Sequence, residues 1–193
     1  RPDVDLDHPT LRINVHIDRN ICTVSLDSSG QSLHKRGYKT ASTIAPINEV
    51  LAAGMVMLSG WEGQCNFMDP MCGSGTILTE AAMIACNIPP NLNRDEFGFE
   101  TWPDFDIDLF EIIENAALKK IKDFHFKIYG ADKDGYTLDK AKENIKNANL
   151  QDFIEVKQQD FFTSEKPVDK PMYLLFNPPY DERISVDDID AFY

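Results

Sequence analysis

The stretch DPMCGSGTILTEAAM, residues 69–83, joins an acidic strand end to an apolar helix through a turn rich in small residues. The preceding CNFM predicts a short buried strand that ends at Asp69, and the apolar pattern that follows predicts a helix over 76–88. Two prolines terminate that helix. Glycines between a strand and a helix let a ligand approach the backbone, so this stretch predicts a strand, a binding turn and a helix in direct succession.

The remaining chain repeats the alternation of strands and helices. Apolar residues at helical spacing predict a helix with Pro46 in its first turn and Gly60 at its end, and another from Asp108 to Phe124. Further along, the patterns predict strand, helix, strand and strand at 126–132, 135–150, 152–156 and 172–176. Strands that alternate with helices favour an α/β fold, with a parallel sheet covered on both faces and ligands at the carboxyl ends of the strands.

An antiparallel hairpin is predicted ahead of this α/β part. Apolar and polar residues alternate over 11–17 and again over 22–26, which is the pattern of two half-buried strands. The pattern breaks at DSSGQSLHKRGYK, and we place a sub-domain boundary near Ser28. The expected organisation is therefore a hairpin domain, a connecting segment with a helix, and an α/β domain, at 1–27, 28–60 and 61–193.

Composition restricts the class of protein. The chain has 193 residues, 42% of them apolar, and no apolar run approaches the roughly 18 residues that a membrane span needs. The N-terminus shows no apolar signal-peptide region, so we expect a soluble cytoplasmic protein without membrane contact. Four cysteines form no CxxC pair and lie near no histidine cluster, which predicts neither a metal site nor disulfides. The net charge of −13 opposes unaided binding to nucleic acid.

The glycine turn lacks the residues of two common phosphate sites. A dinucleotide fingerprint needs a third glycine where the sequence has Ile77 or Leu78, and a GxxxxGKS/T phosphate-binding loop needs a lysine that this stretch does not contain. The free N–H groups at a helix start still favour a carboxylate or a phosphate. On its own, the turn indicates a nucleotide or a similar cofactor.

Carboxylates also stand at the ends of two later strands. Asp132 ends the strand in YGADKD, where a carboxylate can accept hydrogen bonds from both hydroxyls of a ribose; Asp134 is the competing candidate. Asp160 in QQDFF could accept the exocyclic amine of an adenine while Phe161 packs on its ring. Ordinary solvent-exposed turns contain the same residue types. These two carboxylates therefore indicate a cofactor site only in combination with the other strand ends.

The fourth strand end, LLFNPPYDERI, predicts a rigid polar loop. Asn177, Pro178, Pro179 and Tyr180 supply an amide, a free carbonyl and an aromatic ring. If Asn177 Oδ1 and the Pro178 carbonyl each accept one N–H of an exocyclic amine, the nitrogen can turn its lone pair towards an electrophile while Tyr180 stacks on the flat substrate. Such catalysis is mostly positioning and electrostatics. The loop contains no cysteine, which disfavours the covalent route of carbon methylation.

These four strand ends, taken in order, resemble class I S-adenosylmethionine-dependent methyltransferases that act on amino nitrogens. The segments LDSSGQSLHKRGYKTASTIAPINEVLAAGMVMLSGW, DPMCGSGTILTEAAMIACNIPPNLNR and NPPYDERI are similar, more narrowly, to the THUMP-containing ribosomal RNA guanine-N2 methyltransferases of the RlmL type. Members of that family are often labelled N6-adenine DNA methylases. The resemblance covers nearly the whole chain.

The resemblance implies S-adenosylmethionine as cofactor, RNA as partner and a role for each strand end. Asp132 takes the ribose, Asp160 with Phe161 takes the adenine, and the loop from Asn177 to Tyr180 holds the target amine. The implied cofactor-binding residues are Asp69, Met71, Cys72, Gly73, Gly75, Thr76, Asp132, Lys133, Asp160 and Phe161.

The resemblance also bears on the two ends of the sequence. It implies that the hairpin forms the last strands of a THUMP domain, an RNA-binding module, and that TIAPINEV closes over the methionine end of the cofactor. Because the sequence stops just after the fourth strand, we expect a truncated Rossmann-like sheet that belongs to a longer polypeptide. Asp181 stands where the family usually has glycine, and its charge puts the placement of the substrate in question.

Four alternatives remain open at the level of the sequence. Adenine N6 in DNA or a glutamine side chain in a protein would suit the same loop, and an RNA-binding module without catalysis would suit the same fold. A nicotinamide dehydrogenase is disfavoured by the missing third glycine. The THUMP-like hairpin favours RNA, because DNA and protein methylases have no need of it.

Overall fold

The structure, a computed structural model, describes residues 3–5, 9–40 and 46–178. Its centre is a parallel four-stranded sheet with the strand order β5-β4-β3-β6. The strands are β3 (Asn66–Asp69), β4 (Ile128–Asp132), β5 (Ile154–Gln158) and β6 (Met172–Leu174). The predicted parallel sheet is confirmed, and because all four strands run in one direction their carboxyl ends meet at one edge.

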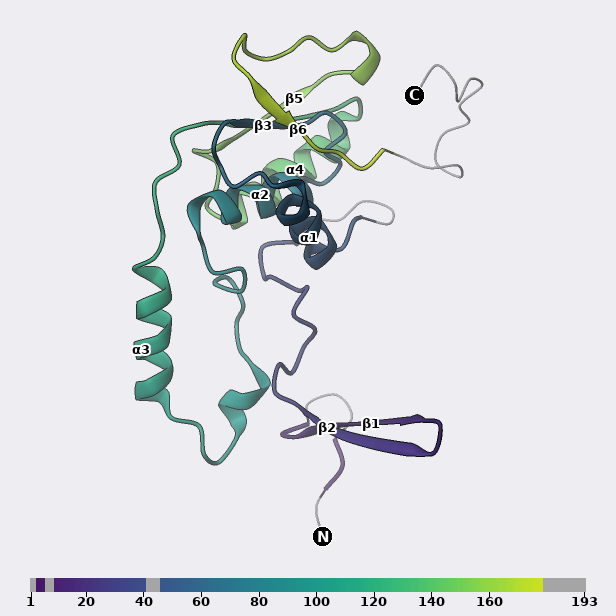
Figure 1. Cartoon of the computed structure of the whole chain (residues 1–193), viewed down its shortest axis with the longest axis vertical. Coiled ribbons are helices and arrows are strands. Elements are labelled where there is room, and N and C mark those ends of the chain that lie inside the picture. Colours follow the sequence, from purple (N-terminus) through teal and green to yellow (C-terminus); the bar gives the residue numbers. More distant parts are fainter. Residues whose placement is uncertain (1–2, 6–8, 41–45, 179–193) are drawn as a thin grey trace.

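Three helices accompany this sheet: α2 (Thr76–Cys86) and α4 (Gly135–Asn147) pack on its strands, and α1 (Glu49–Ser59) packs on α2. They lie on the same side of the sheet (Figure 1), so the prediction of helices on both faces is wrong for the residues that the structure describes. Large buried side chains fill the space between the layers, among them Trp61, Phe67, Leu78, Ile128, Leu138 and Leu150. Their burial is the main stabilising contribution to this half of the molecule.

Capping residues explain where the helices begin and end. Asn48 caps α1 by accepting the N–H groups of Val50 and Leu51, so Pro46 lies before the helix and not in its first turn as predicted. Gly60 ends α1 in a left-handed conformation at φ 79°, which confirms the predicted stop. Asn87 ends α2 in the same conformation, two residues before the first proline of the Pro-Pro pair.

Helix α3 (Ile107–Leu118) ends six residues earlier than predicted. Lys119 caps it, and Lys120 and Ile121 close turn-type hydrogen bonds instead of continuing the helix. The helix lies away from the sheet (Figure 1), and every side chain on it is exposed or half-buried. At its start, Phe110 joins an aromatic cluster with Phe97, Phe99 and Phe105, which anchors α3 to the segment before it.

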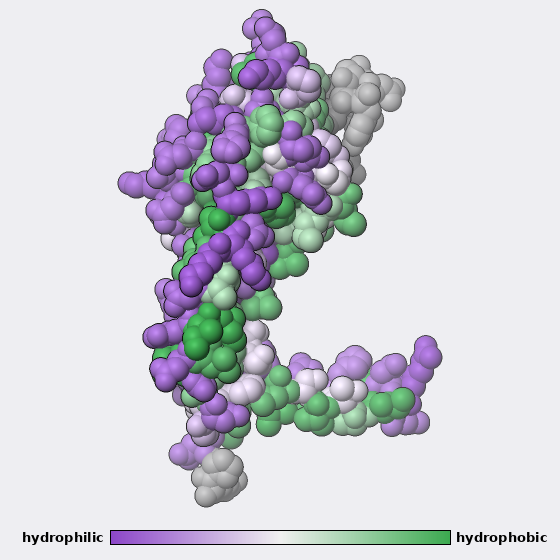
Figure 2. Space-filling view, turned by 60° about the vertical axis from the view of Figure 1, so that its left-hand side comes forward, coloured by the Kyte–Doolittle hydropathy of each residue, from purple (hydrophilic) through white to green (hydrophobic). Residues whose placement is uncertain are grey.

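The predicted hairpin exists as β1 (Arg12–Asp18) and β2 (Ile21–Asp27). Its strands are not half-buried as predicted, because only Asp27 among their residues is less than exposed. The alternation places Ile13, Val15 and Ile17 opposite Leu26, Val24 and Cys22, which gives the hairpin one apolar face that no described residue covers. Figures 1 and 2 show the hairpin projecting from the rest of the molecule.

The segment after β2 is fastened to the segment after α2. Arg94 donates to three backbone carbonyls of the segment after β2, those of Ser29 at 2.8 Å, Gln31 at 2.7 Å and Ser32 at 3.3 Å. Gly98 passes so close that an added Cβ would lie 2.7 Å from the Gly30 nitrogen. These contacts hold the hairpin at the far end of the α2–β4 connection (Figure 1).

Candidate active site

Backbone hydrogen bonds bring the carboxyl ends of the four strands together. The Cys72 N–H donates to the Ala131 carbonyl at 2.9 Å, and the Gln159 N–H donates to the Asp132 carbonyl at 3.0 Å. On the other side of β3, the Leu175 N–H donates to the Met68 carbonyl at 3.1 Å. The glycine turn after β3 therefore lies between the loops that follow β4 and β6.

The glycine turn needs glycine for two different reasons. Gly73 has φ 55° and an added Cβ would meet nothing within 4 Å, so the space in front of this residue is open to a ligand. Gly75 has φ 80°, and its Cβ would lie 3.2 Å from Ala141 Cβ on α4. Gly73 thus leaves room for a ligand and Gly75 leaves room for a neighbouring helix.

The start of α2 offers polar groups next to this open space. Gly75 is the N-cap and has no side chain to satisfy the first N–H groups of the helix. Thr76 follows it, and the buried Thr76 Oγ1 has no hydrogen-bond partner among the described residues. A helix start of this kind favours a negatively charged group such as a carboxylate.

Asp132 and Asp134, the two candidates for a ribose-binding carboxylate, have different partners. Asp132 lies at the end of β4, where Oδ2 accepts the Gly73 N–H and Oδ1 accepts the Asp134 N–H, each at 3.0 Å. Asp134 is the N-cap of α4 and accepts the N–H groups of Tyr136 and Thr137. Asp132 is therefore the carboxylate that faces the glycine turn, whereas Asp134 stabilises a helix start. The Lys133 side chain is exposed, and its carbonyl accepts from Gln158.

The ends of β5 and β6 meet through aromatic rings. Phe161 packs against Phe176 with 5.7 Å between ring centroids, and Phe176 immediately precedes Asn177. Asp160 is exposed and accepts the Phe162 N–H at 2.9 Å, which caps a short 3-10 turn. Asn177 and Pro178 are half-buried. Pro179 and Tyr180, the rest of the predicted substrate loop, lie outside the described residues.

Asp69 is fully buried at the base of the turn, where its carboxylate accepts the Met71 N–H at 3.0 Å. Burial, with a smaller contribution from the nearby Asp132, raises the pKa of Asp69 to about 7. Burial likewise raises the pKa of the Cys72 thiol well above its usual range. The site thus holds a carboxyl group that is partly protonated near neutral pH, and a thiol that remains protonated there.

The raised pKa of Asp69 predicts how stability depends on pH. Because the folded chain binds this proton more tightly than the unfolded chain does, the contribution is favourable at low pH and is lost as pH rises from about 4 to about 7. Between pH 5.5 and 6.5 we expect the unfolding free energy to fall by about 1.2 kcal/mol relative to an Asp69→Asn variant. Urea denaturation of both proteins across this range measures the difference. Parallel profiles would mean that Asp69 stays ionised.

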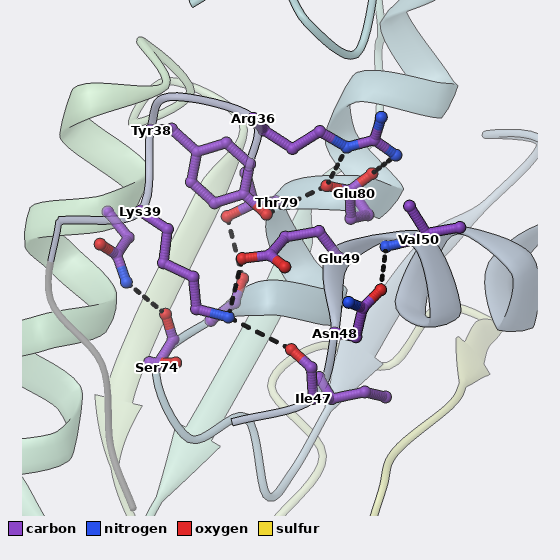
Figure 3. Close-up of polar contacts among 12 residues, drawn as sticks. Arg36, Tyr38, Lys39, Ile47, Asn48, Glu49, Val50, Ser74, Thr79 and Glu80 are labelled. Carbon is purple, nitrogen blue, oxygen red and sulfur yellow. Dashed lines mark hydrogen bonds and ion pairs between the residues drawn. The ribbon is translucent and has the colours of Figure 1, made fainter. Parts of the chain in front are cut away.

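A second set of buried charges lies behind the turn, and the sequence analysis missed it. Arg36 and Tyr38 both contact Glu80 on α2: Arg36 Nε lies 3.4 Å from Glu80 Oε1, and the Tyr38 hydroxyl donates to the same oxygen at 3.0 Å. Lys39 pairs with Glu49 at 3.0 Å (Figure 3). Glu80 is the single charged residue in the sequence of α2, and this was the available signal. The contacts fasten the segment before α1 to the helix that follows the glycine turn.

Two further properties concern the described residues as a whole. None of the helices in this part of the chain has the length and apolar character needed to cross a bilayer. No group of three or more histidine, cysteine, aspartate or glutamate residues is arranged there to hold a metal ion.

The strand order, the glycine turn after β3 and the acidic end of β4 define an α/β fold of the methyltransferase type. The model of the RMKL-like methyltransferase domain matches residues 36–193, and the THUMP domain model matches residues 1–27. The chain therefore belongs to the RMKL-like methyltransferase domain family. The family resemblance of the sequence is confirmed.

Similar proteins agree with this family. The ribosomal RNA large subunit methyltransferase K/L of Marinomonas sp. (strain MWYL1) is 40% identical in an alignment of length 192 that covers 95% of this chain and 27% of that protein. Crystal structures that match include SMU.472, described as a methyltransferase complexed with SAH, with 38% identity and a TM-score of 0.84. Another is a predicted N6-adenine-specific DNA methylase from Listeria monocytogenes str. 4b F2365, with 37% identity and a TM-score of 0.85. The match to each of these two structures covers 94% of this chain and 47% of the solved chain.

Proposed function

We propose that this chain is part of an enzyme that transfers a methyl group from S-adenosylmethionine to an exocyclic amine of RNA, with guanine N2 in large-subunit ribosomal RNA as the target. The observation that carries the proposal is the open glycine turn whose Gly73 N–H is held by Asp132 at the end of the next strand. This pairing of a turn with a carboxylate suits a nucleoside cofactor that carries a charged tail.

The residues at the strand ends fit the parts of this cofactor. The start of α2 with the Thr76 hydroxyl suits the methionine carboxylate, since that hydroxyl is buried without a partner among the described residues. Asp132 still has lone pairs for ribose hydroxyls, because each of its oxygens accepts one backbone N–H. Phe161 and Asp160 provide a ring and a carboxylate for the adenine, and the exposed Lys133, next to Asp132 in the sequence, completes the proposed cofactor-binding residues.

In the proposed transfer step, the residues that follow β6 orient the target amine. S-adenosylmethionine, when bound, supplies an activated methyl group. Asn177 Oδ1 and the Pro178 carbonyl are acceptors, and together they can take the two N–H groups of an amine and direct its lone pair. Pro178 has no N–H, so its carbonyl is its only backbone hydrogen-bonding group. Its ring fixes the φ angle, which limits the motion of the loop. From the sequence alone, we propose that Pro179 stiffens the same loop and that Tyr180 stacks on the flat substrate.

RNA is favoured over DNA and protein by two findings. Residues 1–27 match the THUMP domain, and the Marinomonas relative is named a ribosomal RNA methyltransferase. The Listeria structure, in contrast, is described as a predicted N6-adenine-specific DNA methylase, so adenine N6 in DNA is the competing target. The charge of −13 on this chain opposes contact with either polyanion, and the rest of a longer polypeptide would have to supply most of the basic surface.

Calorimetric titration of S-adenosylmethionine into the full-length protein that contains this chain tests the cofactor, with NAD and ATP as comparison ligands. We expect binding of S-adenosylmethionine alone among the three. Transfer of labelled methyl groups to ribosomal RNA, to DNA and to protein then tests the substrate, and we expect label in RNA, at guanine N2. Absence of S-adenosylmethionine binding would refute the methyltransferase proposal, and label in DNA would move the target to adenine N6.

A further inference from the structure

Helix α4 reaches the back of the glycine turn through one buried side chain. Asn144 is 1% exposed, and its Nδ2 donates to the Ser74 carbonyl at 3.1 Å. An amide buried in the apolar face of a helix is costly unless it is hydrogen-bonded. The sequence pattern contains a signal for it, since Asn144 follows Leu138 and Ala141 at helical spacing on the face that α4 buries.

The contact fixes the orientation of one peptide plane. The Ser74 carbonyl and the Gly75 N–H belong to the same peptide group and point in opposite directions. With the carbonyl directed at Asn144, the Gly75 N–H donates to the Cys72 carbonyl at 2.9 Å and closes the turn. Gly75, on one side of this peptide group, can adopt a wide range of φ angles, so the turn depends on external contacts for its shape.

Helix α4 contacts the glycine turn at a second position as well, close to Gly75. Ala141 lies three residues before Asn144, and its Cβ would be 3.2 Å from a Cβ on Gly75. Residues at this spacing lie on one face of a helix, so Ala141 and Asn144 contact the turn together. Asp132, at the end of the strand that leads into α4, holds the Gly73 N–H from the front.

We propose that Asn144 is a positioning residue for the cofactor. By holding the Ser74 carbonyl, it keeps the glycine turn in its ligand-accepting shape before the cofactor arrives, so that binding costs less ordering of the turn. The inference rests on the proposed function, because it assumes that the turn binds S-adenosylmethionine. It assigns to α4 a role that no residue of the predicted site set carries.

Three variants of the full-length protein test this role by calorimetric titration with S-adenosylmethionine. Asn144→Ala removes the donor, and we expect it to weaken binding about tenfold. Asn144→Asp places a carboxylate against the Ser74 carbonyl, so we expect a larger loss. Asn147→Asp is the matched control: Asn147 lies on the same helix and donates to Tyr38 and Thr40 instead of the turn, so its affinity should match the wild type.

Hydrogen exchange of the ligand-free proteins supplies a readout that needs no ligand. We expect faster exchange at Gly75 in both Asn144 variants, with no change there in Asn147→Asp. If Asn144→Asp unfolds, the affinity for S-adenosylmethionine and the hydrogen exchange at Gly75 of the Asn144→Ala variant test the inference. Unchanged affinity and exchange in a folded Asn144 variant would overturn the inference and leave the proposed function intact, whereas a wild-type protein that binds no S-adenosylmethionine would overturn both.

Discussion

Replacement of Asn177 by alanine is expected to lower the rate of methyl transfer by about 10²–10³-fold while S-adenosylmethionine still binds with nearly the wild-type affinity. The side-chain oxygen of Asn177 is proposed to accept one of the two amine hydrogens, and this contact matters most when the nitrogen lone pair turns towards the methyl group. Asn177 follows the end of β6, on the opposite side of β3 from Asp132. Its loss therefore leaves the glycine turn and the ribose-binding carboxylate in place.

Single-turnover methylation of RNA with saturating cofactor measures the transfer step, and titration of the same variant measures cofactor binding. Asn115→Ala is the control, since Asn115 is an exposed asparagine on α3 whose side-chain amide donates to the Glu111 carbonyl within the same helix. The control should retain full activity. A transfer rate in Asn177→Ala equal to that of the control would remove Asn177 from the proposed mechanism.

The sequence predicted those parts of the site that depend on local patterns. Strand ends can be located from apolar runs that stop at an acidic residue, which is why Asp69 and Asp132 were found. The turn was found because Gly73 and Gly75 stand between a strand and a helix, and both have positive φ in the structure. At these two positions the local backbone conformation favours glycine, and at Gly75 the close approach of α4 does so as well.

The parts that sequence reasoning missed depend on contacts between distant residues. Asn144 and Ser74 are 70 positions apart, and Tyr38 and Glu80 are 42 apart, so no local pattern links them. A single polar residue on an apolar helix face was the available signal in each case. This signal indicates that a buried partner exists. The identity of the partner follows only from the tertiary packing, which places α4 on the glycine turn and residues 36–39 on α2.

The error on the burial of the hairpin and the error on the end of α3 have different physical origins. Periodicity shows that a segment has an apolar face, but it does not show what covers that face. The alternation in the hairpin therefore suggested half-buried strands, whereas Val15 is 56% exposed; on α3 the apolar Ile112 is likewise 65% exposed. The end of α3 was misplaced because Lys119, Lys120 and Ile121 continue a helical pattern without a glycine or proline to stop it.

Replacement of Asp132 by alanine is expected to weaken S-adenosylmethionine binding about 10²-fold. Two losses combine: the carboxylate no longer accepts hydrogen bonds from the ribose, and the Gly73 N–H loses the acceptor that lies 3.0 Å away. Hydrogen bonds to a charged acceptor are stronger than those between neutral groups, so two of them suffice for a loss of this size. The effect should appear in the dissociation constant of the cofactor, with transfer restored in part at high cofactor concentration.

Asp134→Ala is the matched control, because Asp134 is also a carboxylate and lies two residues away but caps α4. Loss of the cap should lower the melting temperature of the protein and leave cofactor affinity close to the wild type. The pair of variants thus separates the two carboxylates that the sequence left as competitors. If Asp134→Ala weakened binding more than Asp132→Ala did, the ribose would belong to Asp134, and the contact between Asp132 and Gly73 would serve only the shape of the turn.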